Sequence, residues 1–219
     1  GMVDRARVAW AGEVDIRLGI ESDYIPGMEP WLEKLHRRAS FHHVLGSVHA
    51  HLPDYKTRYF HDDMEAFQKT YFEHLALAAE TGLFDTIAHP DLVKNISPLD
   101  WHIDRVMAFI LPCLDRISIA GTAMELNTSG LNTALAEMSP GSEMLREMQK
   151  RNIPVVIGAD AHDPHRVAAN FTDALDMLSD AGYTHVSMFL DRVRADLPIE
   201  QVRSSLKITE HAAESSNRL

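Results

Sequence analysis

Short apolar segments alternate with longer amphipathic segments along most of this 219-residue chain. The short segments predict β-strands, because each holds a few mainly apolar residues bounded by polar or turn-forming residues. Six strands are expected, at 15–21, 44–49, 85–89, 122–127, 155–160 and 185–189. A strand followed by a helix, repeated, indicates parallel strands joined by helical crossovers. The sequence therefore predicts an α/β fold on a parallel sheet, either open or forming most of a barrel.

The segments between these strands have helical spacing. Between residues 62 and 81, Met64, Phe67, Tyr71 and Leu75 fall on one side of a helix. Further helices are expected at 3–11, 100–117, 142–151, 166–181 and 199–215. No linker or internal repeat divides the sequence, so residues 1–219 are expected to form a single domain.

Charge and cysteine content exclude several classes of protein. With 21 Lys and Arg against 32 Asp and Glu, the net charge is −11, which disfavours binding to nucleic acid or to an anionic membrane. Apolar runs stay well short of the roughly 20 residues of a membrane helix. Cys113 is the only cysteine, which excludes an intramolecular disulfide and favours a cytoplasmic location.

Metal-binding residue types gather where the expected strands end. Four of the predicted strands carry such a residue at or just beyond their carboxyl ends. The residues are Glu21, His49, His89 and, after the strand at 155–160, both Asp160 and His162. The carboxyl ends of parallel strands share one rim, so these side chains are expected to converge. Asp160 and His162 are two residues apart and would point to the same side of an extended segment. Carboxylates and imidazoles together suit Zn, Mn or Fe.

Each of these residues also has a structural interpretation when it is considered alone. Glu21 is compatible with a surface position, the segment His89-Pro90-Asp91 with a turn, and Asp160 with the start of a helix. The shared position at strand ends favours the metal site over these separate interpretations.

Five ordered segments resemble the PHP superfamily, and specifically its histidinol-phosphatase branch. They are LGIESDYIPG, LGSVHAH, GLFDTIAHPDLVK, ELNTSGL and IGADAHDPHRVAANF. The resemblance implies a distorted (β/α)7 TIM-like barrel with up to three metal ions at its rim. It also implies hydrolysis of a small-molecule phosphate monoester, typically L-histidinol phosphate, in histidine biosynthesis.

The resemblance also implies roles for individual residues. Glu21, His49 and His89 resemble the ligands of one ion, Asp160 a ligand of a second and His162 a ligand of a third, with Asp160 and His162 also counted as catalytic. Substrate binding is assigned to Lys94, Glu125 and Asn127. Lys94 lies where a basic residue meets the substrate phosphate, and the other two resemble a strand-end pair in the same rim.

The sequence departs from the family pattern at its start. Family members open with an H-x-H strand, whereas no histidine precedes Glu21 here. The barrel is therefore expected to be incomplete at its N-terminus, through a late start or a truncated gene, and to hold at most one or two ions. Asn132 and Thr133 also stand where family members often carry a basic residue.

Two alternatives remain open from the sequence. One is a metal-dependent amidohydrolase on a (β/α)8 barrel. The other is a truncated chain with little or no catalysis, which survives as a homo-oligomer that covers the exposed sheet edge.

Overall fold

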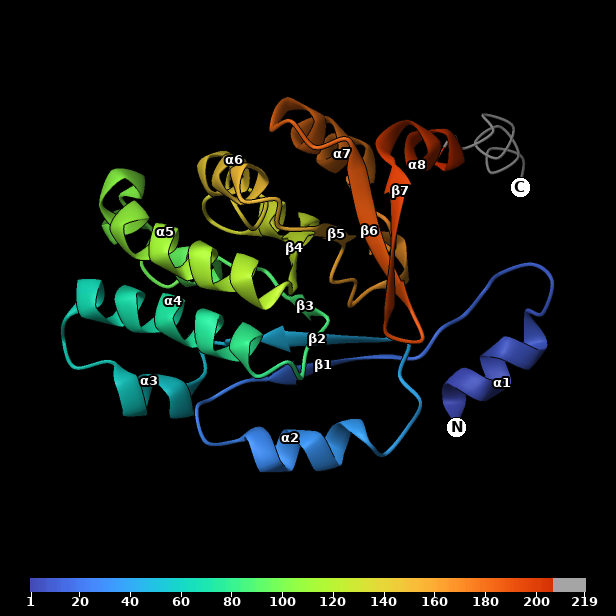
Figure 1. Cartoon of the computed structure of the whole chain (residues 1–219), viewed down its shortest axis with the longest axis horizontal. Helices are drawn as coiled ribbons and strands as arrows, with labels where there is room; N and C mark the ends of the chain where they lie inside the picture. Colours follow the sequence, from blue (N-terminus) through green and yellow to red (C-terminus); the bar gives the residue numbers. More distant parts are fainter. Residues whose placement is uncertain (207–219) are drawn as a thin grey trace, which may run out of the picture.

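A five-stranded parallel sheet forms the centre of the protein in the computed structural model, which describes residues 1–206 (Figure 1). Its strands are β1 (Gly19–Asp23), β2 (His43–Ser47), β3 (Thr86–Ile87), β4 (Ala123–Asn127) and β5 (Val155–Gly158). They pair in sequential order, β1-β2-β3-β4-β5. All crossovers therefore run in one direction around the sheet, which is how the wall of a barrel is built. Within residues 1–206 the sheet stays open, with β1 and β5 at its edges.

Helices form an arc around the strands (Figure 1). They are α1 (Met2–Ala9), α2 (Glu29–His36), α3 (Pro53–Tyr59), α4 (Met64–Glu80), α5 (Ile103–Ala120), α6 (Ser142–Lys150), α7 (Phe171–Asp180) and α8 (Ile199–Ser205). Helix α4 begins where the Asp63 side chain accepts a hydrogen bond from the backbone N–H of Ala66, at 3.0 Å. It buries Phe67, Tyr71 and Leu75, the apolar face expected from their spacing.

The predicted helices at 62–81, 100–117, 142–151 and 166–181 correspond to α4, α5, α6 and α7, with ends that differ by a few residues. Helix α7 starts five residues later than expected, because a short 3₁₀ turn (Pro164–Arg166) precedes it. The predicted helix at 199–215 is seen as α8, and its part beyond residue 206 lies outside the described residues. Helices α2 and α3 were not predicted.

The sixth predicted strand was placed wrongly in the parallel sheet. The segment becomes β6 (His185–Leu190), which pairs antiparallel with β7 (Val193–Pro198) in a separate two-stranded sheet. The turn residues Asp191 and Arg192 both have left-handed backbone, with φ of 53° and 62°. Two such residues in succession make the turn that a tight hairpin needs.

The tip of this hairpin is fixed to the amino end of the central sheet. The Arg192 guanidinium donates to both Asp85 oxygens at 3.1 Å and to the Leu83 carbonyl at 2.9 Å. The Asp191 carboxylate pairs with His42 at 2.8 Å, and the Phe189 ring stacks on His43. These contacts attach the tip of the hairpin to the amino ends of β2 and β3.

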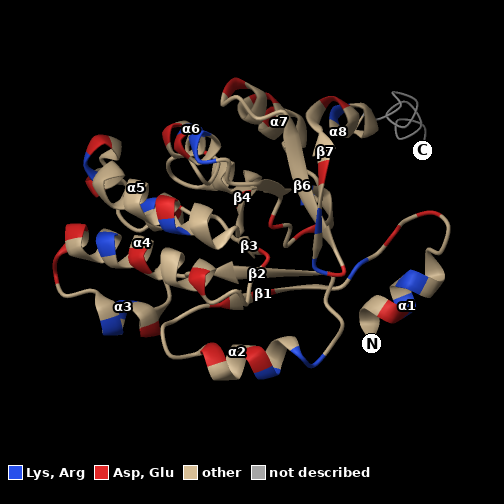
Figure 2. Ribbon diagram, in the orientation of Figure 1, with Lys and Arg blue, Asp and Glu red and all other residues tan. Residues whose placement is uncertain are grey.

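Charged residues of both signs alternate along the outer helices (Figure 2). On α5, Arg116 bonds Glu80 at 2.6 Å and Glu73 at 2.7 Å, both on α4, and so ties the two helices together. Among residues 1–206, none of the helices combines the length and apolar character that a membrane span requires.

Candidate active site

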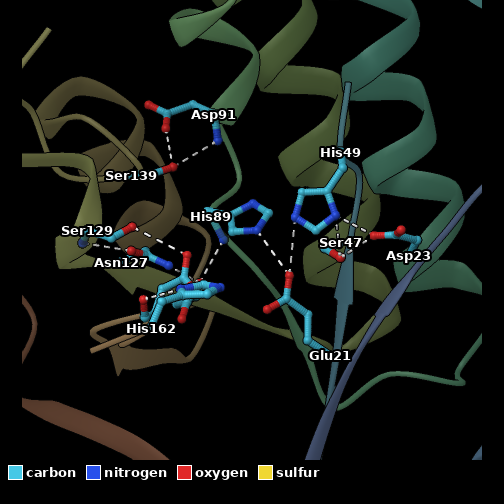
Figure 3. Close-up of polar contacts among 12 residues, drawn as sticks. Glu21, Asp23, Ser47, His49, His89, Asp91, Asn127, Ser129, Ser139 and His162 are labelled. Carbon is cyan, nitrogen blue, oxygen red and sulfur yellow. Dashed lines mark hydrogen bonds and ion pairs between the residues drawn. The ribbon is translucent and has the colours of Figure 1, made fainter. Parts of the chain in front are cut away.

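The carboxyl ends of the strands bring the predicted site residues together (Figure 3). Glu21 lies within β1, and His49 follows β2 by two residues. His89 follows β3 by two residues, and Asp160 follows β5 by two residues. The first three converge closely, because β1, β2 and β3 are neighbours in the sheet. The prediction that these distant residues meet at one rim is thus matched by their positions.

Glu21, His49 and His89 form a group that could hold a metal ion. One ligand atom from each lies within 4.8 Å of the others. Glu21 Oε1 is 3.4 Å from His49 Nε2 and 3.2 Å from His89 Nε2. His89 is buried, whereas the Glu21 side chain remains 35% exposed. The group is therefore open to solvent on the side of β1.

The contacts of His49 favour a cation at this position. Its Nδ1 contacts Asp23 Oδ1, an interaction that requires a proton on Nδ1. Its Nε2 faces Glu21 Oε1 at 3.4 Å, so a cation placed between them would be held by both atoms. A carboxylate on the distal nitrogen is also the usual support of a metal-binding histidine. The donor set thus fits a divalent ion.

Electrostatics at Glu21 and His89 lead to the same conclusion. The hydrogen bond with His89 lowers the pKa of Glu21. Burial works against a charge on His89, but its hydrogen bond to Glu21 and the nearby charge of Glu125 raise its pKa overall. The site thus stabilises positive charge beside an ionised carboxylate. A metal ion would take the place of the His89 proton.

Glu125 supports the loop that carries His89. Its Oε2 accepts a hydrogen bond from the His89 backbone N–H at 2.9 Å and another from Asn127 Nδ2 at 3.1 Å. The Glu125 side chain is buried, and burial raises its pKa. Gly158 on β5 makes room for it, since a Cβ there would lie 1.8 Å from Glu125 Oε1. Glu125 and Asn127 therefore position His89 from below the rim.

Asp160 and His162 line a cavity of about 250 Å³ together with His49 and His89. We call this hollow the rim cavity; its lining also includes His51 and Ser129. Asp160 lies 3.5 Å from the Ser129 hydroxyl, which donates to it. His162 is 88% exposed, and its Nδ1 is 3.0 Å from the Asp160 carbonyl oxygen.

Asp160 and His162 do not lie in an extended segment, so that part of the prediction was wrong. An extended segment was expected to carry both side chains to one side. The strand instead ends at Gly158, and Asp160 has a left-handed backbone with φ of 46°. A bend, not an extended segment, brings the two residues to the rim cavity. Neither belongs to the close group of Glu21, His49 and His89.

The structure contradicts the predicted contact of Lys94 with a phosphate. Its side chain is fully buried, and Nζ donates to Asp91 at 3.0 Å, to Glu137 at 2.8 Å and to the Met138 carbonyl at 2.7 Å. All three donor positions of the ammonium group are thus used within the fold. Asp91 also accepts from Ser139 Oγ and, at 2.8 Å, from the Gly141 N–H. Lys94 therefore holds the loop after β3 against the segment around Ser139.

Sequence reasoning had not assigned a role to Asp23, Ser129 or Asp91. Each follows the same signal as the predicted residues, namely a polar side chain near the carboxyl end of a strand. Asp23 touches His49, Ser129 touches Asp160, and Asp91 anchors Lys94. Polar residues at strand ends therefore locate the site in the sequence. They do not distinguish metal ligands from the residues that hydrogen-bond to those ligands.

Comparison with known proteins identifies the family. The chain is 35% identical over 179 residues to a probable histidinol-phosphatase of Deinococcus radiodurans, covering 79% of this chain and 67% of that protein. The chain belongs to the histidinol-phosphatase family. A histidinol-phosphatase of Bacillus subtilis is 25% identical over 177 residues, with 70% of this chain and 65% of that protein covered. The chain thus spans about two thirds of the length of these relatives. It matches no protein-family model.

Solved structures of this family have the same fold. A histidinol phosphate phosphatase from Lactococcus lactis, solved with zinc, L-histidinol and phosphate, superimposes with a TM-score of 0.72 at 16% identity, over 89% of this chain and 77% of that one. A putative histidinol phosphatase from Listeria monocytogenes gives a TM-score of 0.67 at 19% identity, over 78% of this chain and 73% of that one. The prediction of an α/β fold with a parallel sheet is therefore confirmed.

Proposed function

We propose that this chain is a metal-dependent phosphatase that hydrolyses L-histidinol phosphate to L-histidinol and phosphate. The observation that supports this most is the group Glu21, His49 and His89, whose ligand atoms lie within 4.8 Å of one another at the rim of the sheet. The named activity of the 35% identical relative favours a phosphatase over an amidohydrolase.

The proposal extends to the architecture around the site. The five parallel strands are part of the wall of a (β/α)7 TIM-like barrel, and residues 1–219 belong to a single domain. Within residues 1–206 no strand pairs with the outer edge of β1, and a second copy of the chain would pair there, since unpaired strand edges attract other strands. We further propose that the protein is cytoplasmic and binds at most one or two ions. We propose no nucleic-acid or membrane partner for it.

A divalent ion at Glu21, His49 and His89 would neutralise charge on the phosphate and favour deprotonation of the attacking water. The protein residues position that chemistry. Asp23 fixes the orientation and tautomer of the His49 ring. Glu125 fixes the His89 loop through the backbone N–H. Hydrolysis of a phosphate ester asks mainly for such positioning and for charge neutralisation.

Asp160 and His162 are proposed to act from the opposite wall of the rim cavity. Asp160 lines the same hollow as His89 and would be a ligand of a second ion there. His162 is exposed, and an imidazole can both accept and donate a proton. We assign it the transfer of a proton to the leaving alcohol oxygen.

The test measures phosphate release from L-histidinol phosphate by the metal-loaded chain, with Zn²⁺ and Mn²⁺ supplied separately. Glu21→Gln should lower kcat/KM by more than about 100-fold, because even supporting residues of metal sites are worth 10–100-fold. Asp160→Asn and His162→Ala should each lower kcat by at least about tenfold.

Two exposed residues away from the rim provide matched controls, His61→Ala for His162 and Asp180→Asn for Asp160. Both controls should retain parental rates. If the site variants release phosphate as fast as their controls, the proposed function is wrong.

A further inference from the structure

A second hollow lies at the opposite end of the strands from the rim cavity. Its walls include Pro154 and Val155, where β5 begins, and Thr184 and His185, where β6 begins. We call it the amino-end pocket; its volume is about 210 Å³. None of the described residues lines both this pocket and the rim cavity. It is therefore separate from the proposed phosphatase site.

The amino-end pocket lies between two sheets that strand pairing does not join. Strand β6 lies beside β5, but within residues 1–206 it pairs only with β7, so the hairpin forms a sheet of its own (Figure 1). Both sides contribute to the pocket, with Gln149 and Asn152 before β5 and Arg194 and Asp196 on β7. A ligand that bonds to both sides would link the hairpin to the central sheet.

The hairpin side of the pocket carries a positive and a negative group next to each other. Arg194 and Asp196 are two residues apart on β7 and so share a face of the strand. Ser187 lies opposite Asp196 in the register, and its hydroxyl donates to Asp196 Oδ1 at 2.6 Å. Arg194 Nε faces the same oxygen at 3.3 Å. Among the described residues, nothing hydrogen-bonds to Asp196 Oδ2 or to the two terminal nitrogens of Arg194.

The side formed by the segment before β5 adds polar groups that carry no charge. The Gln149 amide nitrogen donates to the Gly182 carbonyl at 3.3 Å, which leaves the amide oxygen as an acceptor. Asn152 is exposed, and within residues 1–206 its side-chain amide makes no hydrogen bond. The pocket thus offers donors on Arg194 and Asn152 and acceptors on Asp196 and Gln149. Such a set suits a ligand that carries a carboxylate and an ammonium group together.

We propose that the amino-end pocket binds a free α-amino acid. The Arg194 guanidinium would hold the carboxylate through two parallel hydrogen bonds, a geometry that favours arginine at carboxylate sites. The ammonium group would donate to Asp196 Oδ2 and to the Gln149 oxygen. A simple anion such as phosphate suits the pocket less well, because the Asp196 carboxylate would repel it. The volume of about 210 Å³ is roughly seven times the share of one water molecule in the liquid, which is enough for a small polar amino acid.

Thermal melts of the whole chain test the ligand class. Glycine, L-alanine, L-serine, L-threonine and L-glutamine are added one at a time at about 10 mM, and at least one of them should raise Tm by roughly 3–5 °C. This is the shift expected for a ligand at about ten times its dissociation constant. Ethanolamine lacks the carboxylate and glycolate lacks the amine, so neither should raise Tm by more than about 1 °C. If none of the five amino acids raises the Tm of the parent protein, the proposal is wrong.

Substitutions test the position of the site by calorimetry with the amino acid that gives the largest shift. Arg194→Gln should weaken its binding about tenfold or more, because the carboxylate loses its charged partner. Asn152→Gly removes the amide and keeps a left-handed backbone, with φ of 53°, that glycine adopts without strain. This variant should weaken binding about threefold.

Arg37→Gln is the matched control for Arg194→Gln. Arg37 also forms an exposed ion pair, with Glu33 at 3.2 Å, and it does not line the pocket. The control should bind the amino acid within about twofold of the parent, and equal affinities for Arg194→Gln and Arg37→Gln would overturn the proposal. Binding is measured without phosphate release, so a protein that binds the amino acid but hydrolyses no ester contradicts only the phosphatase function.

Discussion

Substitution of Gly158 by alanine tests whether the strand-end supports hold the site. The Cβ of an alanine at 158 would lie 1.8 Å from Glu125 Oε1 and 2.8 Å from its carboxyl carbon. Ordinary contact needs roughly 3.5 Å, so the carboxylate oxygen must withdraw by about 1.7 Å. Such a movement breaks the hydrogen bonds of Glu125 Oε2 with the His89 N–H and with Asn127.

The expected cost follows from those two bonds. Each buried polar group left unpaired costs about 1–3 kcal/mol. Alanine returns about 0.4–1 kcal/mol by restricting the unfolded chain. Gly158→Ala should therefore lower the free energy of unfolding by about 3 kcal/mol. It should also weaken Zn²⁺ binding about tenfold, because the His89 loop loses its support.

A double-mutant cycle in urea checks this assignment. In the Glu125→Ala background there is no carboxylate to displace, so Gly158→Ala should be neutral within about 1 kcal/mol. The coupling between the two positions is then about 3 kcal/mol. An equal loss of stability from Gly158→Ala in both backgrounds would refute the reasoning, since the cost would then come from the backbone and not from Glu125.

Three further outcomes are expected. Burial lowers the pKa of His74 from 6.5 to about 4, so its neutral form stabilises the fold above pH 6.5 and this contribution is lost as the pH falls toward 4. At pH 5 this loss amounts to about 2 kcal/mol of the free energy of unfolding. Between pH 7.5 and 5, urea unfolding of His74→Gln should therefore show a loss of stability about 2 kcal/mol smaller than that of the parent. Lys94→Met should destabilise by about 3–5 kcal/mol, because it leaves the buried Asp91 carboxylate without a positive partner; a raised KM with unchanged stability would instead favour a phosphate contact. Zn²⁺ at 100 times its dissociation constant should add about 2.7 kcal/mol to stability, an increase that chelation and Glu21→Gln both abolish in thermal melts.

The rim was predictable from the sequence because it depends on strand direction and not on exact boundaries. Parallel strands place their carboxyl ends together, so Glu21, His49 and His89 converge although β1 starts four residues later than expected. The family resemblance then predicted that these three residues bind one metal ion. The 35% identical relative confirms the family. Their separate roles stay predictions.

Other features depend on information that spacing does not contain. Lys94 resembles an exposed phosphate contact in the sequence, but two of the groups that bind its buried ammonium, Glu137 and the Met138 carbonyl, are 43 and 44 residues away. The turn at Asp191 and Arg192 lacks the Asn-Gly or Asp-Gly pair that usually marks a tight hairpin, so β7 went unrecognised. The first error comes from contacts between distant segments, and the second from a turn that lacks its usual sequence signal.

The hairpin contact between Arg192 and Asp85 has a consequence for how the chain acquires its structure. These partners are 107 residues apart, so a large loop must close before their contact can form. Contacts of such long range slow folding. On the ribosome, the strands made before residue 90 lack the hairpin contact until residue 192 has been synthesised. Asp85 remains without its arginine throughout that interval, which leaves the amino end of the sheet exposed to wrong contacts.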